Sequence, residues 1–209
     1  MKIIIFGPQG SGKGTQAELI ARRQNLPYIS TGDIFRYHIE NKTDLGQKVT
    51  DHINQGHLVP DDLTNEIVQG RINQPDCAVG FVLDGYPRNK NQSDFLANIA
   101  KIDFAIVIEI TDVEAVKRLS DRLACKCGLS YHLKFNPPQT EDVCDKCGGV
   151  LFKRDDDKPD AIKKRLEIYH QETEPLFTIY KNQGVLHQVD GSASIDDVYE
   201  KIEAIIIKK

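Results

Sequence analysis

A glycine-rich segment near the N-terminus, residues 7–15, has the residue types and spacing of a phosphate-binding loop. Its sequence, GPQGSGKGT, follows an apolar run at residues 3–6 and precedes a helical pattern at residues 16–23. Glycines let the backbone curl so that successive N–H groups point inward, and the helix N-terminus adds partial positive charge. In such a loop, Lys13 reaches the β- and γ-phosphates of a nucleotide and Thr15 lies near the magnesium. The alternative is a plain turn with Lys13 in solvent.

The loop departs at one position from the general pattern, in which serine or threonine follows the lysine directly. Gly14 occupies that position, and Thr15 comes one residue later. This form of the loop resembles that of the nucleoside monophosphate kinases, and of adenylate kinases in particular. We therefore follow the resemblance through the later segments of the chain.

An aspartate and an arginine follow the next predicted buried strand, residues 81–84. Asp84 ends that strand, and side chains at the carboxyl ends of parallel strands point into the ligand crevice. We expect Asp84 to hold Mg²⁺ through its coordinated waters. Arg88 presents a planar, always charged guanidinium that suits a phosphate. A purely structural pairing of the aspartate with a nearby arginine is the alternative.

Residues 84–88, DGYPR, resemble the D-G-[FY]-P-R segment of adenylate kinases. Gln92 matches the family glutamine that reads adenine, and its amide both donates and accepts, as an adenine edge requires. Residues 30–36, STGDIFR, are also similar to the family, in which they bind a second nucleotide. The alternative for this segment is helix capping alone, since Ser30 and Asp33 are good caps.

The resemblance implies a small mobile AMP-binding domain at residues 30–59, helical and broken at Gly46 and Gly56. In the family, backbone groups of the segment that closes this domain, residues 56–60, hold adenine. The residues that the resemblance assigns to AMP are Thr31, Gly32, Arg36, His57, Leu58, Val59, Gly85, Arg88, Gln92, Arg154 and Arg165.

Four of the five cysteines form two pairs separated by sixteen residues. Four thiolates at this spacing close a tetrahedral structural Zn²⁺ site, and clustered cysteines in a cytosolic chain favour a metal over disulfides. The predicted ligands are Cys125, Cys127, Cys144 and Cys147. The first pair is C-x-C, which alters the amide-to-sulfur bonds of the usual C-x-x-C knuckle. Cys77 stands alone and is expected to be a small apolar filler.

The segment between the cysteine pairs, with Tyr131, His132 and the run NPP at residues 136–138, resembles the lid of zinc-bearing adenylate kinases. Ahead of this lid, apolar residues at helical spacing predict a helix that carries Arg118 and Arg122 one turn apart. Those apolar residues are Val116, Leu119 and Leu123. The family often has a second arginine where this chain has Leu123.

The resemblance also implies that arginines dominate the chemistry. The AMP phosphate is already an anionic nucleophile, and a metaphosphate-like transition state needs cations and positioning more than a base. The residues assigned to catalysis are Lys13, Asp84, Arg88, Arg122, Arg154 and Arg165. The residues assigned to ATP are Gly10, Ser11, Gly12, Lys13, Gly14, Thr15, Arg122, Tyr131, His132 and Ala193.

The whole chain, 209 residues, is long enough for one α/β domain with small insertions. We predict a P-loop parallel sheet flanked by helices, with a helical monophosphate-binding insertion and a zinc-ribbon-like lid insertion. The core domain takes residues 1–29, 60–121 and 158–209, the AMP-binding domain residues 30–59, and the lid residues 122–157.

Composition is ordinary for a globular protein, with 40% hydrophobic and 28% charged residues. A formal net charge of −4 gives no polyanion-binding surface overall, so any phosphate site must be a local concentration of cations. No apolar run approaches the length of a membrane span, and because Met1 leads directly into the first predicted strand we expect no signal peptide. We expect a cytoplasmic monomer, the family default, with no nucleic-acid or membrane partner.

The resemblance covers essentially the whole chain and implies reversible phosphoryl transfer from Mg²⁺-ATP to AMP, giving two ADP. One alternative is a kinase for another monophosphate, UMP or CMP, against which Thr31 and Gln92 argue. Another is a zinc-ribbon nucleic-acid-binding ATPase, which would need a basic stripe. The lid segment is instead acidic, with Glu141, Asp142 and the aspartates at 155–157.

Overall fold

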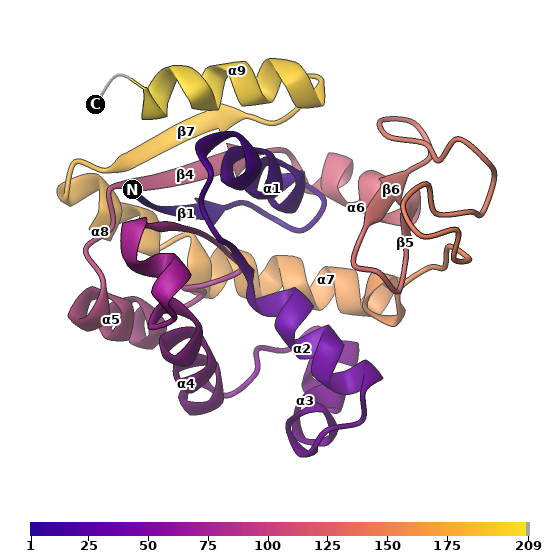
Figure 1. The fold of residues 1–209 in the computed structure, drawn as a ribbon, viewed down its shortest axis with the longest axis horizontal. Coiled ribbons are helices and arrows are strands. Elements are labelled where there is room, and N and C mark those ends of the chain that lie inside the picture. The colour runs from indigo at the N-terminus through magenta and orange to yellow at the C-terminus, as the bar shows by residue number, and fades with distance from the viewer. Residues whose placement is uncertain (208–209) are drawn as a thin grey trace.

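Five parallel strands form the central sheet, in the spatial order β2–β3–β1–β4–β7 (Figure 1). The computed structural model describes residues 1–207. The strands are β1 (Lys2–Phe6), β2 (Tyr28–Ser30), β3 (Phe81–Asp84), β4 (Phe104–Glu109) and β7 (Leu186–Asp190). Their mostly apolar sequences suit this arrangement, because the inner strands of a parallel sheet are buried on both faces. The predicted α/β class is confirmed.

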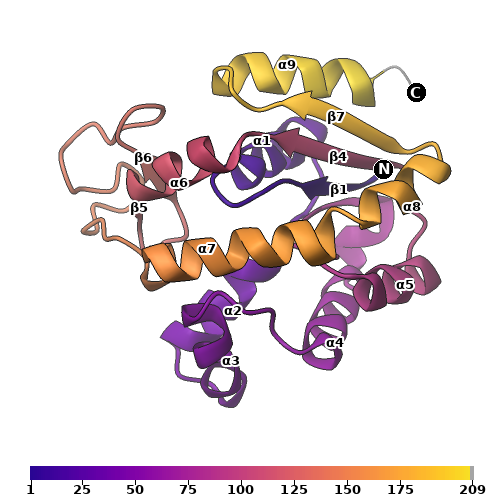
Figure 2. The ribbon, with the colours of Figure 1, turned by 180° about the vertical axis from the view of Figure 1, so that it is seen from behind.

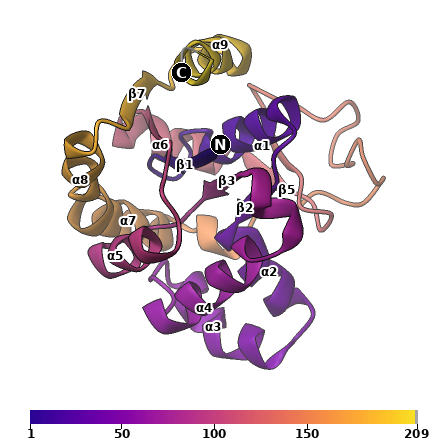
Figure 3. The ribbon, with the colours of Figure 1, turned by 60° about the vertical axis from the view of Figure 1, so that its left-hand side comes forward.

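Helices cover both faces of the sheet, as the view in Figure 3 shows. Ile3 and Ile5 of β1 pack against one layer, formed by α1 and α9. Ile4 and Phe6 face the opposite layer, which includes α4, α5 and α8. The helices that make these layers are α1 (Lys13–Gln24), α4 (Asp61–Ile72), α5 (Lys90–Ile99), α8 (Leu176–Asn182) and α9 (Ile195–Ile206).

Two short helices, α2 (Thr31–Glu40) and α3 (Asp44–Asn54), form a helical unit away from the sheet, at the bottom of Figure 1. Their own small core contains Phe35, Val49 and Val59. The prediction that Gly46 breaks a helix is wrong, because Gly46 lies inside α3. A Cβ there would fall 2.1 Å from the carbonyl oxygen of His38, so the glycine serves close packing of α2 on α3.

The segment from 122 to 157 projects from the sheet as loops around a two-stranded antiparallel hairpin, at the left of Figure 2. The hairpin strands are β5 (Arg122–Ala124) and β6 (Ser130–His132). The helix expected through Leu123 is shorter than predicted, because α6 (Asp112–Ser120) ends before it. Arg122 and Leu123 therefore lie on β5, and Val116 of α6 is exposed.

The chain returns from this segment through α7 (Pro159–Ile168), which runs below β1, β4 and β7 in Figure 1 and continues as a π-helical turn, Tyr169–Thr173. Ile162 and Leu166 of α7 pack on Leu119 of α6. This contact fixes the two ends of the lid segment against each other. Within residues 1–207, no helix combines the length and the apolar character needed to cross a membrane.

Candidate active site

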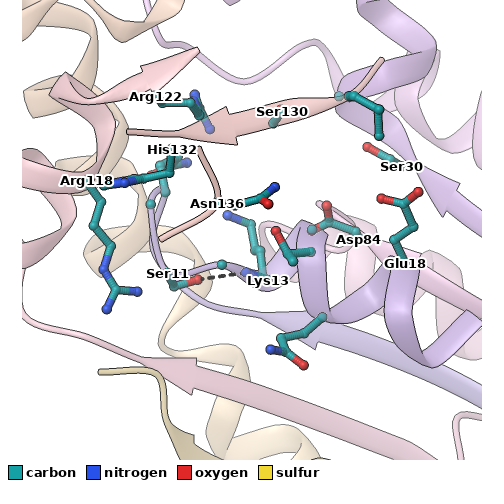
Figure 4. A pocket seen from close by; sticks show the side chains of 18 of the residues that line it. Ser11, Lys13, Glu18, Ser30, Asp84, Arg118, Arg122, Ser130, His132 and Asn136 are labelled. Atoms are coloured by element: carbon teal, nitrogen blue, oxygen red, sulfur yellow. Dashed lines mark hydrogen bonds between the residues drawn. The ribbon is translucent and has the colours of Figure 1, made fainter. Parts of the chain in front are cut away.

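A cavity of about 570 Å³ opens at the carboxyl edge of the sheet, between the phosphate loop and the β5–β6 hairpin (Figure 4). Its walls come from the loop between β1 and α1, the end of β3, the start of α2, α6, the lid segment and α7. Parallel sheets place ligands at this edge, because the loops after the strands meet there. The volume lies within the range of sites for small molecules.

The phosphate loop has the backbone that its glycines predict. Gly10 and Gly12 have φ values of 85° and 87°, in the left-handed region that disfavours other residues. Gly12 caps α1, so the free N–H groups of the first helical turn border the cavity. The Lys13 ammonium donates to the carbonyl oxygen of Pro8 at 3.2 Å and has no carboxylate partner within the described residues.

Buried positive charge is concentrated around this loop. Burial, together with the smaller effects of the guanidinium groups of Arg88, Arg165 and Arg122, lowers the pKa of Lys13 to about 7 against the opposing effect of Asp84. Burial also lowers the pKa of Arg165 to about 10 and that of Arg154 to about 9. Cations held at such a cost in desolvation favour a multiply charged anion in the cavity.

Asp84 is the acidic group that acts most strongly on Lys13 and Arg88. Burial raises the pKa of its carboxyl group, opposed by the charges of Lys13 and Arg88. The Tyr28 hydroxyl donates to one carboxylate oxygen at 3.3 Å, while the other oxygen, Oδ1, is buried without a hydrogen-bond partner. An unpartnered carboxylate oxygen beside a phosphate loop is what the waters of a bound Mg²⁺ would satisfy. Asp84 therefore fits the predicted magnesium role.

Five buried side-chain atoms within residues 1–207 lack a hydrogen-bond partner, and the residues that carry them all line this one cavity. Those atoms are Gln9 Oε1, Gln16 Oε1, Asp84 Oδ1, His132 Nε2 and Arg154 Nε. Buried polar groups are nearly always paired, and leaving one unpaired costs about 1–3 kcal/mol. Their convergence shows that the cavity is built for a polar ligand.

Three of the predicted phosphate-binding arginines are paired with aspartates. Arg122 forms a two-pronged ion pair with Asp157, its Nε donating at 2.9 Å. Arg165 Nη1 lies 3.1 Å from Asp156 Oδ2, and Arg36 pairs with Asp33. Burial by itself would raise the pKa of Asp156, but Arg165 and the other nearby arginines hold it below its usual value. These carboxylates keep the guanidinium groups in place without a nucleotide.

The remaining two arginines have neutral partners. Arg88 Nε donates to the carbonyl oxygen of Gly85 at 2.8 Å, and Arg154 Nη2 donates to Ser130 Oγ at 2.9 Å. Arg154 thereby links the end of the lid segment to β6. The structure thus brings all five predicted arginines and Lys13 to one cavity.

A smaller cavity of about 60 Å³ adjoins the first between α2, residues 56–59 and α5. Arg36, Arg88 and Arg165 line both cavities. The predicted AMP residues that line the smaller one are Thr31, Gly32, Arg36, His57, Leu58, Val59, Gly85, Arg88, Gln92 and Arg165; Arg154 lines only the larger cavity. The shared arginines therefore stand between two binding spaces, as transfer between two nucleotides requires.

Gln92 lies in this smaller cavity with its amide already engaged. Its Oε1 accepts from the Arg88 backbone N–H at 2.8 Å, and its Nε2 donates to Asp61 Oδ1 at 2.7 Å. Only 2% of the residue is exposed. Gln92 therefore holds the Arg88 backbone in place, and adenine recognition by this amide would require exchange of one of these bonds.

Two of the lid residues predicted to bind ATP, His132 and Tyr131, differ in where their polar atoms lie. His132 Nδ1 accepts from the backbone N–H groups of Lys134 and Phe135, at 3.0 and 3.3 Å, which leaves a proton on Nε2 of the neutral ring. Nε2 is the unpartnered atom, and burial lowers the pKa of this histidine. Tyr131 also lines the cavity, but its hydroxyl contacts Cys144. Ala193 lines the opposite wall.

Arg118 was not among the predicted site residues, although it lines the cavity and is only 9% exposed. Its Nε donates to Glu114 at 2.8 Å, and its guanidinium lies 4.7 Å from the centre of the Phe135 ring. Gln9 and Gln16 were also missed. The sequence signal for Arg118 is its i,i+4 spacing from Glu114 just ahead of the lid, which positions an arginine at the end of α6.

The four predicted metal ligands come together in the lid. All four Sγ atoms lie within 4.8 Å of one another, with Cys125–Cys147 at 3.4 Å and Cys127–Cys144 at 3.6 Å. Tetrahedral Zn²⁺ with bonds of about 2.3 Å to sulfur places neighbouring sulfurs roughly 3.8 Å apart. The C-x-C pair therefore fits such a site despite its shorter spacing. Cys77 is buried outside this cluster, beside Arg71.

The fold and the cavity together define an α/β nucleotide-binding protein of the phosphate-loop class. A family model described as "Adenylate kinase" matches residues 5–185. The adenylate kinase of Agathobacter rectalis is 48% identical over 99% of this chain and 99% of its own length. Those of Lachnospira eligens and Methanosarcina barkeri are 47% and 46% identical, over 99% and 100% of this chain and 100% and 99% of their own lengths. The chain belongs to the adenylate kinase family.

Proposed function

We propose a role in phosphoryl transfer for each group of residues that lines this cavity. As a member of its family, the chain is a nucleoside monophosphate kinase, which transfers the γ-phosphoryl group of ATP to AMP and reverses the reaction. The bond from the γ-phosphorus to the β–γ bridging oxygen breaks, and a bond to an AMP phosphate oxygen forms. The products are two ADP. The observation that best supports this division is the row of arginines shared by two adjoining cavities.

The phosphate loop and Lys13 bind the ATP phosphates. Lys13 has no carboxylate partner to exchange, so its charge is available to the β- and γ-oxygens as negative charge moves toward the β-phosphate. Mg²⁺, which accompanies ATP in this family, supplies further neutralisation of the phosphate charges when bound. Asp84 would hold that ion through water, and Thr15, which lines the same cavity, would contribute its hydroxyl there.

Arg36 and Arg88 bind the phosphate of AMP, and Arg165 lies between the two nucleotides. Arg122 and Arg154 approach from the lid side of the larger cavity. Their present partners, Asp157 and Ser130, are released as the phosphates take their place. Because these partners belong to the lid and its hinge, exchange of partners couples nucleotide binding to lid closure, which excludes water from the transferring group.

The adenine of ATP lies between the lid and the loop after β7. His132 offers an N–H donor there, and Ala193 provides an apolar wall. The AMP base lies among His57, Leu58 and Val59, beside Gln92. Residues 30–59 and 122–157 act as the two mobile domains on the remaining core. The protein acts as a cytoplasmic monomer, and its only binding partners are nucleotides.

Zn²⁺ bound by the four cysteines is structural. Four thiolates complete a tetrahedral shell and leave no position for water or substrate. The metal would supply cross-linking to a lid whose own apolar core is small: Leu123, Cys125, Tyr131, Cys144 and Leu151. Its binding energy would then contribute to lid folding.

The test is a coupled assay with Mg²⁺-ATP as donor and AMP, UMP, CMP or GMP as acceptor, at equal concentrations. We expect AMP to have the highest kcat/KM by at least tenfold. Faster transfer to UMP or CMP would contradict the assignment of the smaller cavity to adenine. Zinc content by elemental analysis, measured on the same preparation, tests the metal separately.

A further inference from the structure

Tyr131 connects the cysteine cluster to the nucleotide cavity. It lies on β6 opposite Leu123 of β5 and is 5% exposed. Its ring packs in the lid core, and its hydroxyl oxygen lies 3.5 Å from Cys144 Sγ. Cys144 is itself 1% exposed, so this contact is shielded from competing water. A buried polar tip on an aromatic ring is normally hydrogen-bonded, and here the partner is a predicted metal ligand.

The direction of this hydrogen bond follows from a second contact. The backbone N–H of Asp145 donates to the Tyr131 hydroxyl oxygen at 2.8 Å. A phenol has a single proton, and the amide already points at one of the lone pairs of the oxygen. A metal-bound thiolate has no proton and only accepts. The tyrosine O–H therefore donates to Cys144 Sγ when the cluster holds a metal.

Groups that hydrogen-bond to a ligand atom fix its position and tune the metal. The Tyr131 hydroxyl stands in this relation to Cys144, because its oxygen lies 3.5 Å from the Sγ atom.

We infer that Tyr131 is a positioning residue of the lid metal site, whose O–H···S bond holds the Cys144 thiolate in the geometry that Zn²⁺ requires. The inference rests on the proposed binding of zinc. It also explains the link to the active site. Tyr131 and its neighbour His132 on β6 both line the nucleotide cavity, and the Tyr131 hydroxyl also reaches Cys144.

The test is Tyr131→Phe, which removes the hydroxyl and keeps the ring. The first measurement is the rate of Zn²⁺ transfer from the full chain to a chromogenic chelator. The second is the thiolate-to-metal charge-transfer absorption of the Co²⁺-substituted protein. We expect a 10- to 100-fold loss of metal affinity, with a shifted Co²⁺ spectrum. Tyr37→Phe on α2, where the side chain is exposed, is the matched control and should leave both readouts unchanged.

Melting curves separate a metal-positioning role from simple packing. The Tm difference between wild type and Tyr131→Phe should shrink after chelation, since the O–H···S bond loses its metal-bound acceptor, whereas the Asp145 N–H bond to the hydroxyl does not depend on the metal. Leu123→Ala, which cuts packing opposite the same ring, should lower Tm and leave the Co²⁺ spectrum as in wild type. Unchanged Zn²⁺ transfer in Tyr131→Phe, or a Tm difference that persists fully after chelation, overturns the inference. Wild type without any bound metal overturns it as well, while AMP phosphorylation by that protein would leave the proposed reaction standing.

Discussion

The phosphate-loop core and the lid both position charged groups, but they are stabilised by different interactions. In the core, strands such as β1 and β4 are buried on both faces, and two helical layers hold the loop rigid. In the lid, two strands of three residues each contribute to a single cluster of five buried residues, two of them cysteines. Buried apolar area suffices for the core, whereas an insertion of this size needs a cross-link.

The core and the lid differ in the kind of phosphate-binding group that each of them contributes to the cavity. The core supplies backbone N–H groups and Lys13, which need no movement once the fold is formed. In the proposed mechanism, the lid and its hinge supply Arg122 and Arg154, whose partners Asp157 and Ser130 would be exchanged for phosphates. If the four cysteines bind Zn²⁺ as we propose, the lid would have its own cohesion and could move as a unit on the core.

The largest expected effect belongs to the core. Lys13→Ala should lower kcat by about 10³-fold or more, roughly 4 kcal/mol in transition-state stabilisation, because the ammonium acts on developing charge. The melting temperature should not fall, since the side chain makes one hydrogen bond and its burial is unfavourable to the charge. Steady-state kinetics and melting curves check this. Near-normal turnover would remove the phosphate loop from the mechanism.

Two substitutions should separate the stability of the regions. Ile106→Ala in β4, at a fully buried position, should cost about 2–5 kcal/mol in unfolding free energy and leave the zinc content unchanged. Cys144→Ser should lose zinc and loosen the lid, with transfer activity retained in part at low temperature. Denaturation monitored with zinc analysis checks both, and Cys77→Ser is the control. Stoichiometric zinc in Cys144→Ser would show that this cysteine is not a ligand.

A smaller effect should be confined to the AMP side. Gln92→Leu removes both hydrogen bonds of the amide, and we expect a loss of about 1–3 kcal/mol in AMP recognition with unchanged ATP affinity. The measurement is KM for each nucleotide, with the exposed Gln69→Leu as control. An equal loss at both nucleotides would mean that Gln92 acts only by holding the backbone of Arg88.

The smallest effect is a proton linkage at the loop. The pKa of Lys13 is lowered to about 7, mainly by burial. Bound polyphosphate favours the charged form and raises that pKa, so binding near pH 7.5 should take up about half a proton or more. Affinity should therefore fall as pH rises above 7. Calorimetry in buffers of different ionisation enthalpy measures this uptake, and Lys13→Ala should abolish it.

Much of the fold was predictable because its signals are local. The apolar runs of β1, β3 and β4, the glycine spacing of residues 7–15 and the two cysteine pairs each lie within a few neighbouring residues. Chain order then places the carboxyl ends of parallel strands at one edge. The loop, the arginines and the cysteine cluster could therefore be identified before their geometry was known.

The errors arose where local patterns compete with distant contacts. Leu123 continues the helical spacing of α6, yet it pairs with Tyr131 because the lid hairpin buries it. Gly46 is typical of a helix break, yet it sits inside α3 because the backbone of α2 approaches too closely for a side chain. In both cases a tertiary contact outweighs a propensity of about 1 kcal/mol or less.

The sequence by itself determined the elements, the phosphate loop and the types of charged residue available to the site. Only the tertiary structure decided which polar atoms meet unpaired in one cavity, and that Tyr131 turns its hydroxyl to Cys144 while His132 keeps a free N–H. The physical reason is that hydrogen-bond partners and burial depend on side chains brought together from many segments of the chain. The residue type fixes which charges and hydrogen-bonding atoms a side chain has. Packing decides which of these atoms remain unpaired and can bind a ligand.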